Sequence, residues 1–190
     1  MKKTLEEFMR NEAHALVSNG KIDNEFGLQF ELGCYLRKQG YDVYFEKNIK
    51  NKSTCKHEID LVVEKENKKY AIELKFPKGE NKGRKVTIYN FIKDIQFAEQ
   101  LKELNFDGTY CVSMVDSDSY YEITGKEKNE HWKFFRGKVA NGNVSAEKKL
   151  GGTITKWVKG KAADTYVLNK EHQIEWINIG GDLWAYIVEI

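Results

Sequence analysis

The chain has 190 residues, of which 41% are hydrophobic and 32% charged, and its net charge is only +2, which is typical of a single folded globular domain. No apolar run approaches the ~20 residues of a membrane-spanning helix, and acidic side chains follow the N-terminal lysines where a signal peptide would be apolar. We therefore expect a cytoplasmic protein without membrane contact. The cysteines are far apart and form no CxxC pair, which argues against a disulfide framework and a cysteine-rich zinc site.

The first 115 residues alternate between helical and strand patterns. Asn24 can cap a helix that ends at Gly40. Apolar residues recur at helical spacing again in a long segment after Pro77. In chain order we expect a short helix at 3–18, a helix at 24–40 and strands at 41–49, 58–63 and 70–76. A basic loop at 77–85, a long helix at 87–104 and a strand at 109–115 follow.

After Asp116 the sequence changes to short aromatic-rich segments with glycine-containing turns. These segments are typical of strands: WKFFRGKV, GTITKWVKG, DTYVLN, QIEWINI and LWAYIVEI. Residues 121–170 hold eleven basic and five acidic side chains, as a phosphate-binding flank or a solvated strand surface would. We predict one α/β domain over residues 1–190, with a core at 20–116 and a β-rich C-terminal extension at 117–190.

Charged residues lie inside the strands predicted at 58–63 and 70–76. If Val63 pairs with Tyr70 across a six-residue turn, the apolar faces of the two strands match and Asp60 lies opposite Glu73. Two carboxylates at that separation repel each other unless a cation, a proton or a basic partner lies between them. Because Mg²⁺ binds carboxylate oxygens and fills its other positions with water and phosphate, the pair is consistent with half of a metal site.

The same register offers a simpler explanation. It places Glu58 opposite Lys75, so the polar face would be an exposed ladder of ion pairs, each contributing only ~0–1 kcal/mol. The ExK pattern occurs three times, at residues 66–68, 73–75 and 147–149. Among these, 73–75 lies within an apolar strand that follows a strand with an aspartate on the matching face. We therefore favour the functional interpretation.

Asp60, followed by Glu73-Leu74-Lys75 on the next strand, resembles the pattern of the PD-(D/E)xK phosphodiesterase superfamily. The resemblance covers roughly residues 24–115 and includes the order helix, three strands, helix, strand. Ile59 stands where the family often has proline. The resemblance implies a restriction-endonuclease-like core with a three-strand meander, and metal-dependent hydrolysis of phosphodiester bonds.

The resemblance also implies a role for each residue of the pattern. Asp60 and Glu73 would ligate Mg²⁺ or Mn²⁺ together with the backbone carbonyl of Leu74. Lys75 would orient or help to deprotonate the attacking water and stabilise the charge that develops on the phosphate.

Family members often add an acidic residue from the helix before the first strand. The candidates here are Glu31 and Glu25. Glu25 lies within the edge of the apolar stripe of the predicted helix, whereas the spacing to Asp60 that is usual in the family favours Glu31. We rank Glu31 first and keep Glu25 as its substitute.

Basic and polar residues near this pattern are candidates for contact with nucleic acid, ordinary solvent exposure being the alternative. Four follow the second acidic strand and two lie one turn apart on the long helix: Lys78, Lys82, Arg84 and Lys85, and Lys93 and Gln96. We predict a Mg²⁺- or Mn²⁺-dependent endonuclease acting on DNA in defence, repair or mobile-element biology, with RNA as the alternative substrate. A homodimer or a partner protein is compatible with this prediction. The competing hypothesis is a non-catalytic module that binds nucleic acid or protein on the same fold.

Overall fold

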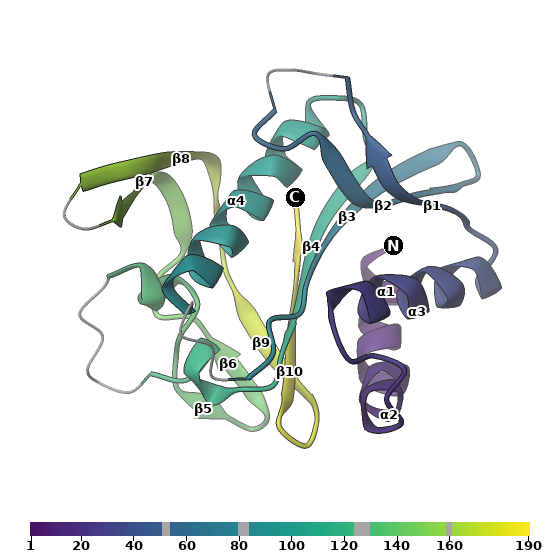
Figure 1. The fold of residues 1–190 in the computed structure, drawn as a ribbon, viewed down its shortest axis with the longest axis horizontal. Coiled ribbons are helices and arrows are strands. Elements are labelled where there is room, and N and C mark those ends of the chain that lie inside the picture. The colour runs from purple at the N-terminus through teal and green to yellow at the C-terminus, as the bar shows by residue number, and fades with distance from the viewer. Residues whose placement is uncertain (51–53, 80–83, 124–129, 159–160) are drawn as a thin grey trace.

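A computed structural model describes residues 1–50, 54–79, 84–123, 130–158 and 161–190. Within these residues, eight strands form one mixed sheet in the order β1-β2-β3-β4-β10-β9-β6-β5, and β7 and β8 form a separate pair. Helices α1 to α3 lie on one side of the main sheet and α4 on the other (Figure 1). The chain is therefore an α/β protein. In the part of the chain described, no helix combines the length and apolar character that crossing a bilayer requires.

The N-terminal residues form three consecutive helical segments, and a longer helix follows after a turn. Their bounds are α1 at Lys2–Phe8, a π-helical turn at Met9–Ala13, α2 at His14–Ser18 and α3 at Glu25–Lys38. The side chain of Asn24 accepts a hydrogen bond from the backbone N–H of Gly27 at 2.8 Å. The predicted helix cap is thus confirmed.

Three antiparallel strands follow, and a fourth strand returns after the long helix. Their bounds are β1 at Asp42–Asn48, β2 at Glu58–Lys65, β3 at Lys68–Lys75, α4 at Arg84–Lys102 and β4 at Gly108–Val115. β3 and β4 pair in parallel, which requires a crossover such as α4 between them. The predicted order of helix, three strands, helix and strand is confirmed.

Most of the C-terminal strands extend the main sheet, while β7 and β8 pair only with each other among the described residues. Their strands are β5 at Val139–Ala140, β6 at Asn143–Ser145, β7 at Leu150–Val158, β8 at Lys161–His172, β9 at Glu175–Gly180 and β10 at Leu183–Glu189. β10 pairs antiparallel with β4. The strand predicted at WKFFRGKV is wrong, because Glu130–Phe134 is a 3₁₀ helix and Phe135 is fully buried against α4. Tertiary packing overrides the β propensity of these aromatic residues.

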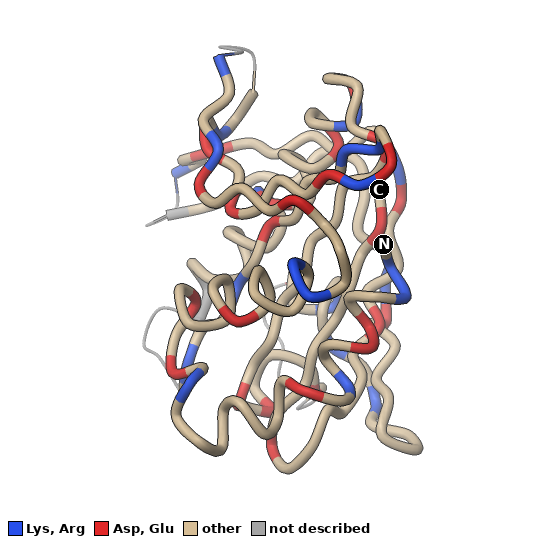
Figure 2. The backbone as a smooth tube through the Cα atoms, turned by 90° about the vertical axis from the view of Figure 1, so that its right-hand side faces the viewer, with Lys and Arg blue, Asp and Glu red and all other residues tan. Residues whose placement is uncertain are grey.

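Apolar clusters fill both sides of the main sheet. On one side Phe91 of α4 packs against Trp176 and Tyr186 of the C-terminal strands. On the other side the helices α1 and α3 contribute Phe8 and Leu28. β4 is buried along its whole length, because helices cover both of its faces. Seen from the side of α1 to α3, acidic and basic residues are interspersed along the backbone (Figure 2).

Candidate functional site

β2 and β3 form a hairpin whose register matches the prediction. Val63 pairs with Tyr70, and the pairing continues to the strand ends at Lys65 and Lys68. The turn therefore has two residues instead of the six predicted. Residues 66–67 have φ values of 52° and 61°, as a type I′ hairpin turn requires.

At the other end of the hairpin, two carboxylates accept hydrogen bonds from the backbone. Asp60 Oδ2 accepts the N–H of Leu74 at 2.7 Å, and Glu73 Oε1 accepts the N–H of Asp60 at 3.4 Å. The carbonyl of Asp60 accepts a hydrogen bond from Gln29 Nε2 at 2.7 Å, which joins β2 to α3. The structure thus brings together the two acidic side chains that the register predicted, and backbone contacts fix both of them.

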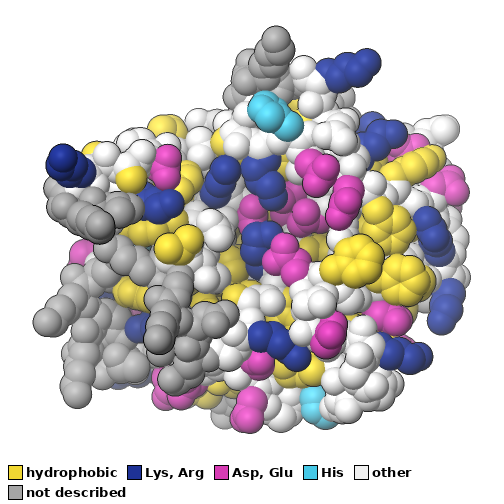
Figure 3. Space-filling model, in the orientation of Figure 1, with side chains coloured by type: hydrophobic (Ala, Val, Ile, Leu, Met, Phe, Trp, Pro, Cys, Tyr) yellow, Lys and Arg dark blue, Asp and Glu magenta, His cyan; other side chains and the backbone are white. Residues whose placement is uncertain are grey.

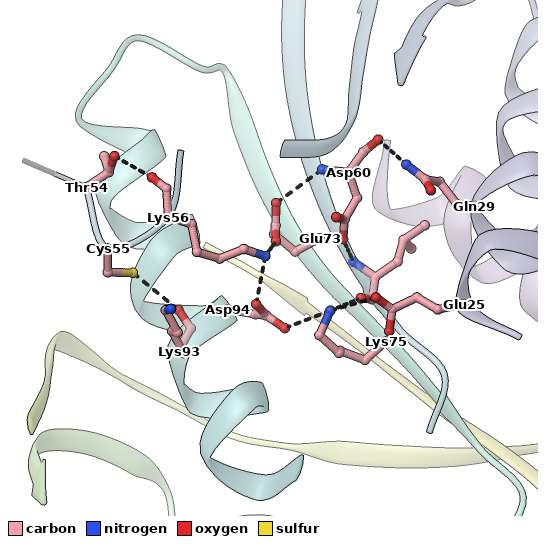
Figure 4. A network of polar contacts seen from close by, with 11 residues as sticks. Glu25, Gln29, Thr54, Cys55, Lys56, Asp60, Glu73, Lys75, Lys93 and Asp94 are labelled. Atoms are coloured by element: carbon pink, nitrogen blue, oxygen red, sulfur yellow. Dashed lines mark hydrogen bonds and ion pairs between the residues drawn. The ribbon is translucent and has the colours of Figure 1, made fainter. Parts of the chain in front are cut away.

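The Lys75 ammonium lies beside this pair (Figure 4). Its Nζ donates to Glu25 Oε1 at 3.0 Å and to the carbonyl oxygen of Leu74 at 2.7 Å, and lies 3.6 Å from Asp94 Oδ2. Glu25 Oε2 also accepts the backbone N–H of Phe76 at 3.3 Å. The first residue of α3 therefore orients the lysine at the end of β3.

Of the two acidic candidates on α3, Glu25 reaches the site. No hydrogen bond or ion pair within the described residues joins Glu31 to Asp60, Glu73 or Lys75. Glu31 lies almost two turns further along α3, about 9 Å along the helix axis. The geometry therefore favours Glu25 over the first-ranked Glu31, because the N-terminal turn of α3 contacts Lys75 and Phe76 at the end of β3.

Among the residues that the structure describes, the exposed ladder of ion pairs does not form. Glu58 pairs with Asn48 of β1, while Lys75 contacts Glu25. The Glu73 side chain is only 1% exposed. The polar side chains at this end of the hairpin are therefore part of a largely buried cluster and not of a solvated strand face.

Two residues of this cluster were not predicted from the sequence. The ammonium of Lys56, which precedes β2, bonds Glu73 Oε2 and Asp94 Oδ1, the latter at 3.0 Å. Asp94 lies on α4, on the same helix face as the buried Ala98 and Leu101. An aspartate at helical spacing from buried apolar residues was the available signal for Asp94. Lys56 stands in a polar stretch that carries no comparable signal.

Burial and neighbouring charge shift the proton affinities of these groups. Burial raises the pKa of Glu73 well above its usual range, and Asp60 adds to the shift while Lys56 opposes it. Burial by itself lowers the pKa values of Lys56 and Lys75, but the surrounding carboxylates, Asp94 first among them, outweigh it and raise both. Both lysines are therefore cations near neutral pH.

The cluster holds more carboxylates than ammonium groups. Four carboxylates, those of Glu25, Asp60, Glu73 and Asp94, surround two ammonium groups, so two negative charges remain when all are ionised. Acidic and basic side chains gather at the middle of one face, between α3 and α4 (Figure 3). A single divalent cation would balance this excess.

The donor atoms fit a hard divalent cation. They are oxygens, from the carboxylates of Asp60, Glu73 and Asp94 and the carbonyl of Leu74, as Mg²⁺ prefers. Asp94 Oδ2 is buried and has no hydrogen-bond partner in the part of the chain that the structure describes. In the described part of the chain, however, no three acidic, histidine or cysteine side chains already converge as a formed metal site. The lysine ammonium groups engage the carboxylates in this state.

The predicted nucleic-acid contacts fall in different places. Lys78 is exposed beyond β3, with its Nζ 5.5 Å from the centre of the Phe76 ring. Lys93 and Gln96 are half-buried and line an open groove of about 320 Å³ between α4 and the β7–β8 pair, together with Tyr166. Lys82 lies outside the described residues. Arg84 and Lys85 begin α4, but their side chains also lie outside the described part.

Searches of protein-family models, curated proteins and solved structures found no match to this chain. Membership of the PD-(D/E)xK superfamily therefore remains a hypothesis. It depends on the residues and the geometry described above.

Proposed function

We propose that this protein hydrolyses phosphodiester bonds of nucleic acid with the help of Mg²⁺ or Mn²⁺, and that its substrate is DNA. The observation that carries this proposal is the convergence of Asp60, Glu73 and Lys75 at one end of the β2–β3 hairpin, in a cluster that holds more carboxylates than ammonium groups. We also propose that α3, β1 to β3, α4 and β4 are a restriction-endonuclease-like core.

The metal ion would be held by Asp60, Glu73 and the carbonyl of Leu74. When bound, such an ion activates water and neutralises charge on the phosphate. Hydrolysis joins the oxygen of water to phosphorus, breaks one phosphorus–oxygen ester bond and delivers a proton to the departing oxygen. The carboxylates of the chain position the cation for this reaction.

Lys75 would act as a positive charge beside the scissile phosphate. Its ammonium is protonated in this state, because neighbouring carboxylates raise its pKa in spite of burial. A protonated lysine donates hydrogen bonds to phosphate oxygens and does not accept a proton from water. Glu25, at 3.0 Å from Nζ, would hold the ammonium in place. We therefore favour charge stabilisation over proton abstraction as the role of Lys75.

A non-catalytic binding module on the same fold is the second candidate. The observation in its favour is that the Lys56 ammonium already bonds both Glu73 and Asp94. In that case the cluster would be an internal ion-pair network. Binding of nucleic acid without metal-dependent cleavage would support this alternative.

The test is cleavage of linear, supercoiled and single-stranded DNA, and of RNA, with Mg²⁺ or Mn²⁺ and with EDTA. Lys75→Met is compared with Lys68→Met, which removes the same charge from the exposed opposite end of β3. We expect metal-dependent cleavage of DNA that Lys75→Met abolishes and Lys68→Met retains. Cleavage of RNA but not of DNA would mean that RNA is the substrate. An equal loss of cleavage activity in both variants would contradict the assigned site.

A further inference from the structure

Lys56 occupies the position in which a cation would neutralise the site. Its Nζ lies between Glu73 Oε2 and Asp94 Oδ1, and its side chain is 21% exposed (Figure 4). Its ammonium also lies 5.4 Å from the centre of the Phe97 ring. This lysine therefore connects the β2–β3 hairpin to α4 through two buried carboxylates.

One lysine charge does not satisfy these carboxylates. The Asp94 side chain is only 6% exposed and points into the cluster (Figure 4), and its Oδ2 has no hydrogen-bond partner among the described residues. The Lys75 Nζ lies 3.6 Å from this oxygen, which is within ion-pair range but too far for a hydrogen bond. A carboxylate oxygen without a hydrogen bond in an acidic cluster is available to coordinate a cation that binds several oxygens at once.

We propose that Lys56 is a counter-cation that a divalent metal ion displaces, and that Asp94 then becomes a ligand of that ion. This inference rests on the proposed function, because it concerns the same metal. It assigns the site a third carboxylate, contributed by α4. It also makes metal affinity depend on a lysine that competes for the same oxygens.

The two lysines differ in how the fold holds them. Lys75 belongs to β3, and its ammonium bonds the Leu74 carbonyl as well as Glu25. Lys56 lies in the irregular segment before β2, so its long side chain can leave without breaking a strand pair. A divalent ion carries twice the charge of an ammonium group and coordinates more oxygens. Lys56 is therefore the cation that metal binding replaces, and Lys75 remains in place.

Mn²⁺ binding by titration calorimetry tests the competition. Lys56→Met removes the competing charge, so we expect its affinity for Mn²⁺ to rise at least about tenfold above that of the native chain. Lys68→Met, the matched control, should bind within about twofold of native, because an exposed distant charge is screened. Asp94→Asn should bind at least about tenfold more weakly. Circular dichroism establishes that each variant is folded.

A second measurement uses the native chain and needs no variant. Reductive methylation followed by peptide mass spectrometry reports how fast the Lys56 amine reacts. We expect Lys56 to be protected without metal and its methylation to accelerate at least about fivefold with saturating Mn²⁺, while Lys68 reacts at an unchanged rate. This readout still decides the inference if Lys56→Met does not fold.

The outcomes separate this inference from the proposed function. Mn²⁺ binding that Asp60→Asn weakens, with unchanged affinity in Lys56→Met and unchanged Lys56 methylation, would overturn the displacement while the metal site stands. Unchanged affinity in Asp94→Asn would overturn its assignment as a ligand. Binding in Lys56→Met but not in the native chain would support the competition. Absence of binding in both would overturn the proposed function together with this inference.

Discussion

Two buried carboxylates five residues apart on α4 have opposite surroundings. Glu99, 5% exposed, accepts the backbone N–H groups of Asn169 at 2.7 Å and Lys170 at 3.0 Å, and its Oε1 lies 2.7 Å from His172 Nε2. Asp94, 4% exposed, accepts a hydrogen bond from Lys56, but its other oxygen has no hydrogen-bond partner within the described ranges. Both oxygens of Glu99 therefore have polar partners, whereas only one oxygen of Asp94 accepts a hydrogen bond from the described residues.

This difference separates a structural carboxylate from a candidate functional one. Glu99 attaches β8 to α4, and its oxygens have all the partners that a buried acceptor needs. Asp94 shares its lysines with three other acidic groups and retains capacity for another cation. Burial of a charge alone does not distinguish the two; unsatisfied acceptor capacity does.

The largest expected effect is on hydrolysis at the unsatisfied cluster. Asp60→Asn should lower kcat for DNA cleavage about 1,000-fold, because it removes a charged metal ligand worth several kcal/mol in the transition state. The asparagine oxygen can still accept the N–H of Leu74, so the fold should be retained. Glu58→Gln removes an exposed charge from the same strand and should keep near-native activity. Comparable losses in both variants would show that general charge, not the cluster, governs cleavage.

The reactivity of the Cys55 thiol measures how far water is excluded from the surroundings of Asp94. Burial raises the pKa of its thiol from 9.0 to about 11, while Lys93 and Lys56 oppose the shift. Since only the thiolate reacts, its reactive fraction at pH 8 should be about 100-fold below that of an unshifted thiol. Alkylation by iodoacetamide, followed on the Cys55 peptide, should therefore accelerate about tenfold per pH unit from pH 8 to 10. Cys111, 2% exposed, serves as the unreactive internal control. A rate that levels off by pH 9 would mean a more hydrated cluster.

Substitution of Glu99, whose two oxygens both accept hydrogen bonds, should destabilise the fold more than substitution of Asp94. Glu99→Gln replaces an acceptor oxygen with an NH₂ group that faces backbone donors, and should lower the free energy of unfolding by about 2–3 kcal/mol. Urea denaturation monitored by circular dichroism measures this loss. A change below about 1 kcal/mol would mean that β8 is held mainly by its apolar contacts.

Asp94→Asn is the matched substitution and should have the smallest effect on stability. Its amide nitrogen can take the place of Oδ2, which pairs with Lys75 at 3.6 Å but accepts no hydrogen bond from the described residues, while the oxygen still accepts from Lys56. We expect the free energy of unfolding without metal to change by less than about 1 kcal/mol. A loss as large as that of Glu99→Gln would remove the distinction between the two carboxylates.

Local patterns predicted the elements that position the site. The apolar alternation in β2 and β3 determined the register, because a slip of one residue would expose the core face, and the register brought Asp60 near Glu73. The helix capped by Asn24 was likewise readable. The two-residue length of the turn could not be predicted, since polar residues at the strand ends pair as readily as they form a loop.

Residues distant in sequence escaped prediction because their meeting depends on tertiary packing. Family spacing favoured Glu31, yet the angle at which α3 crosses β3 brings Glu25 to Lys75. Lys56 and Asp94 come from a connecting segment and from the helix on the opposite side of the sheet from α3. The apolar periodicity of the sequence does not predict that these groups meet in one cluster.

The α/β class, the hairpin register and the pair of acidic side chains could be predicted from the sequence, since each follows from periodicity within a few neighbouring residues. The tertiary structure decided which further charges surround that pair. It also decided that Glu99 is satisfied while Asp94 is not, because hydrogen bonds from β8 reach one carboxylate and not the other. Electrostatic balance is a property of groups brought together in space, and only folding assembles them.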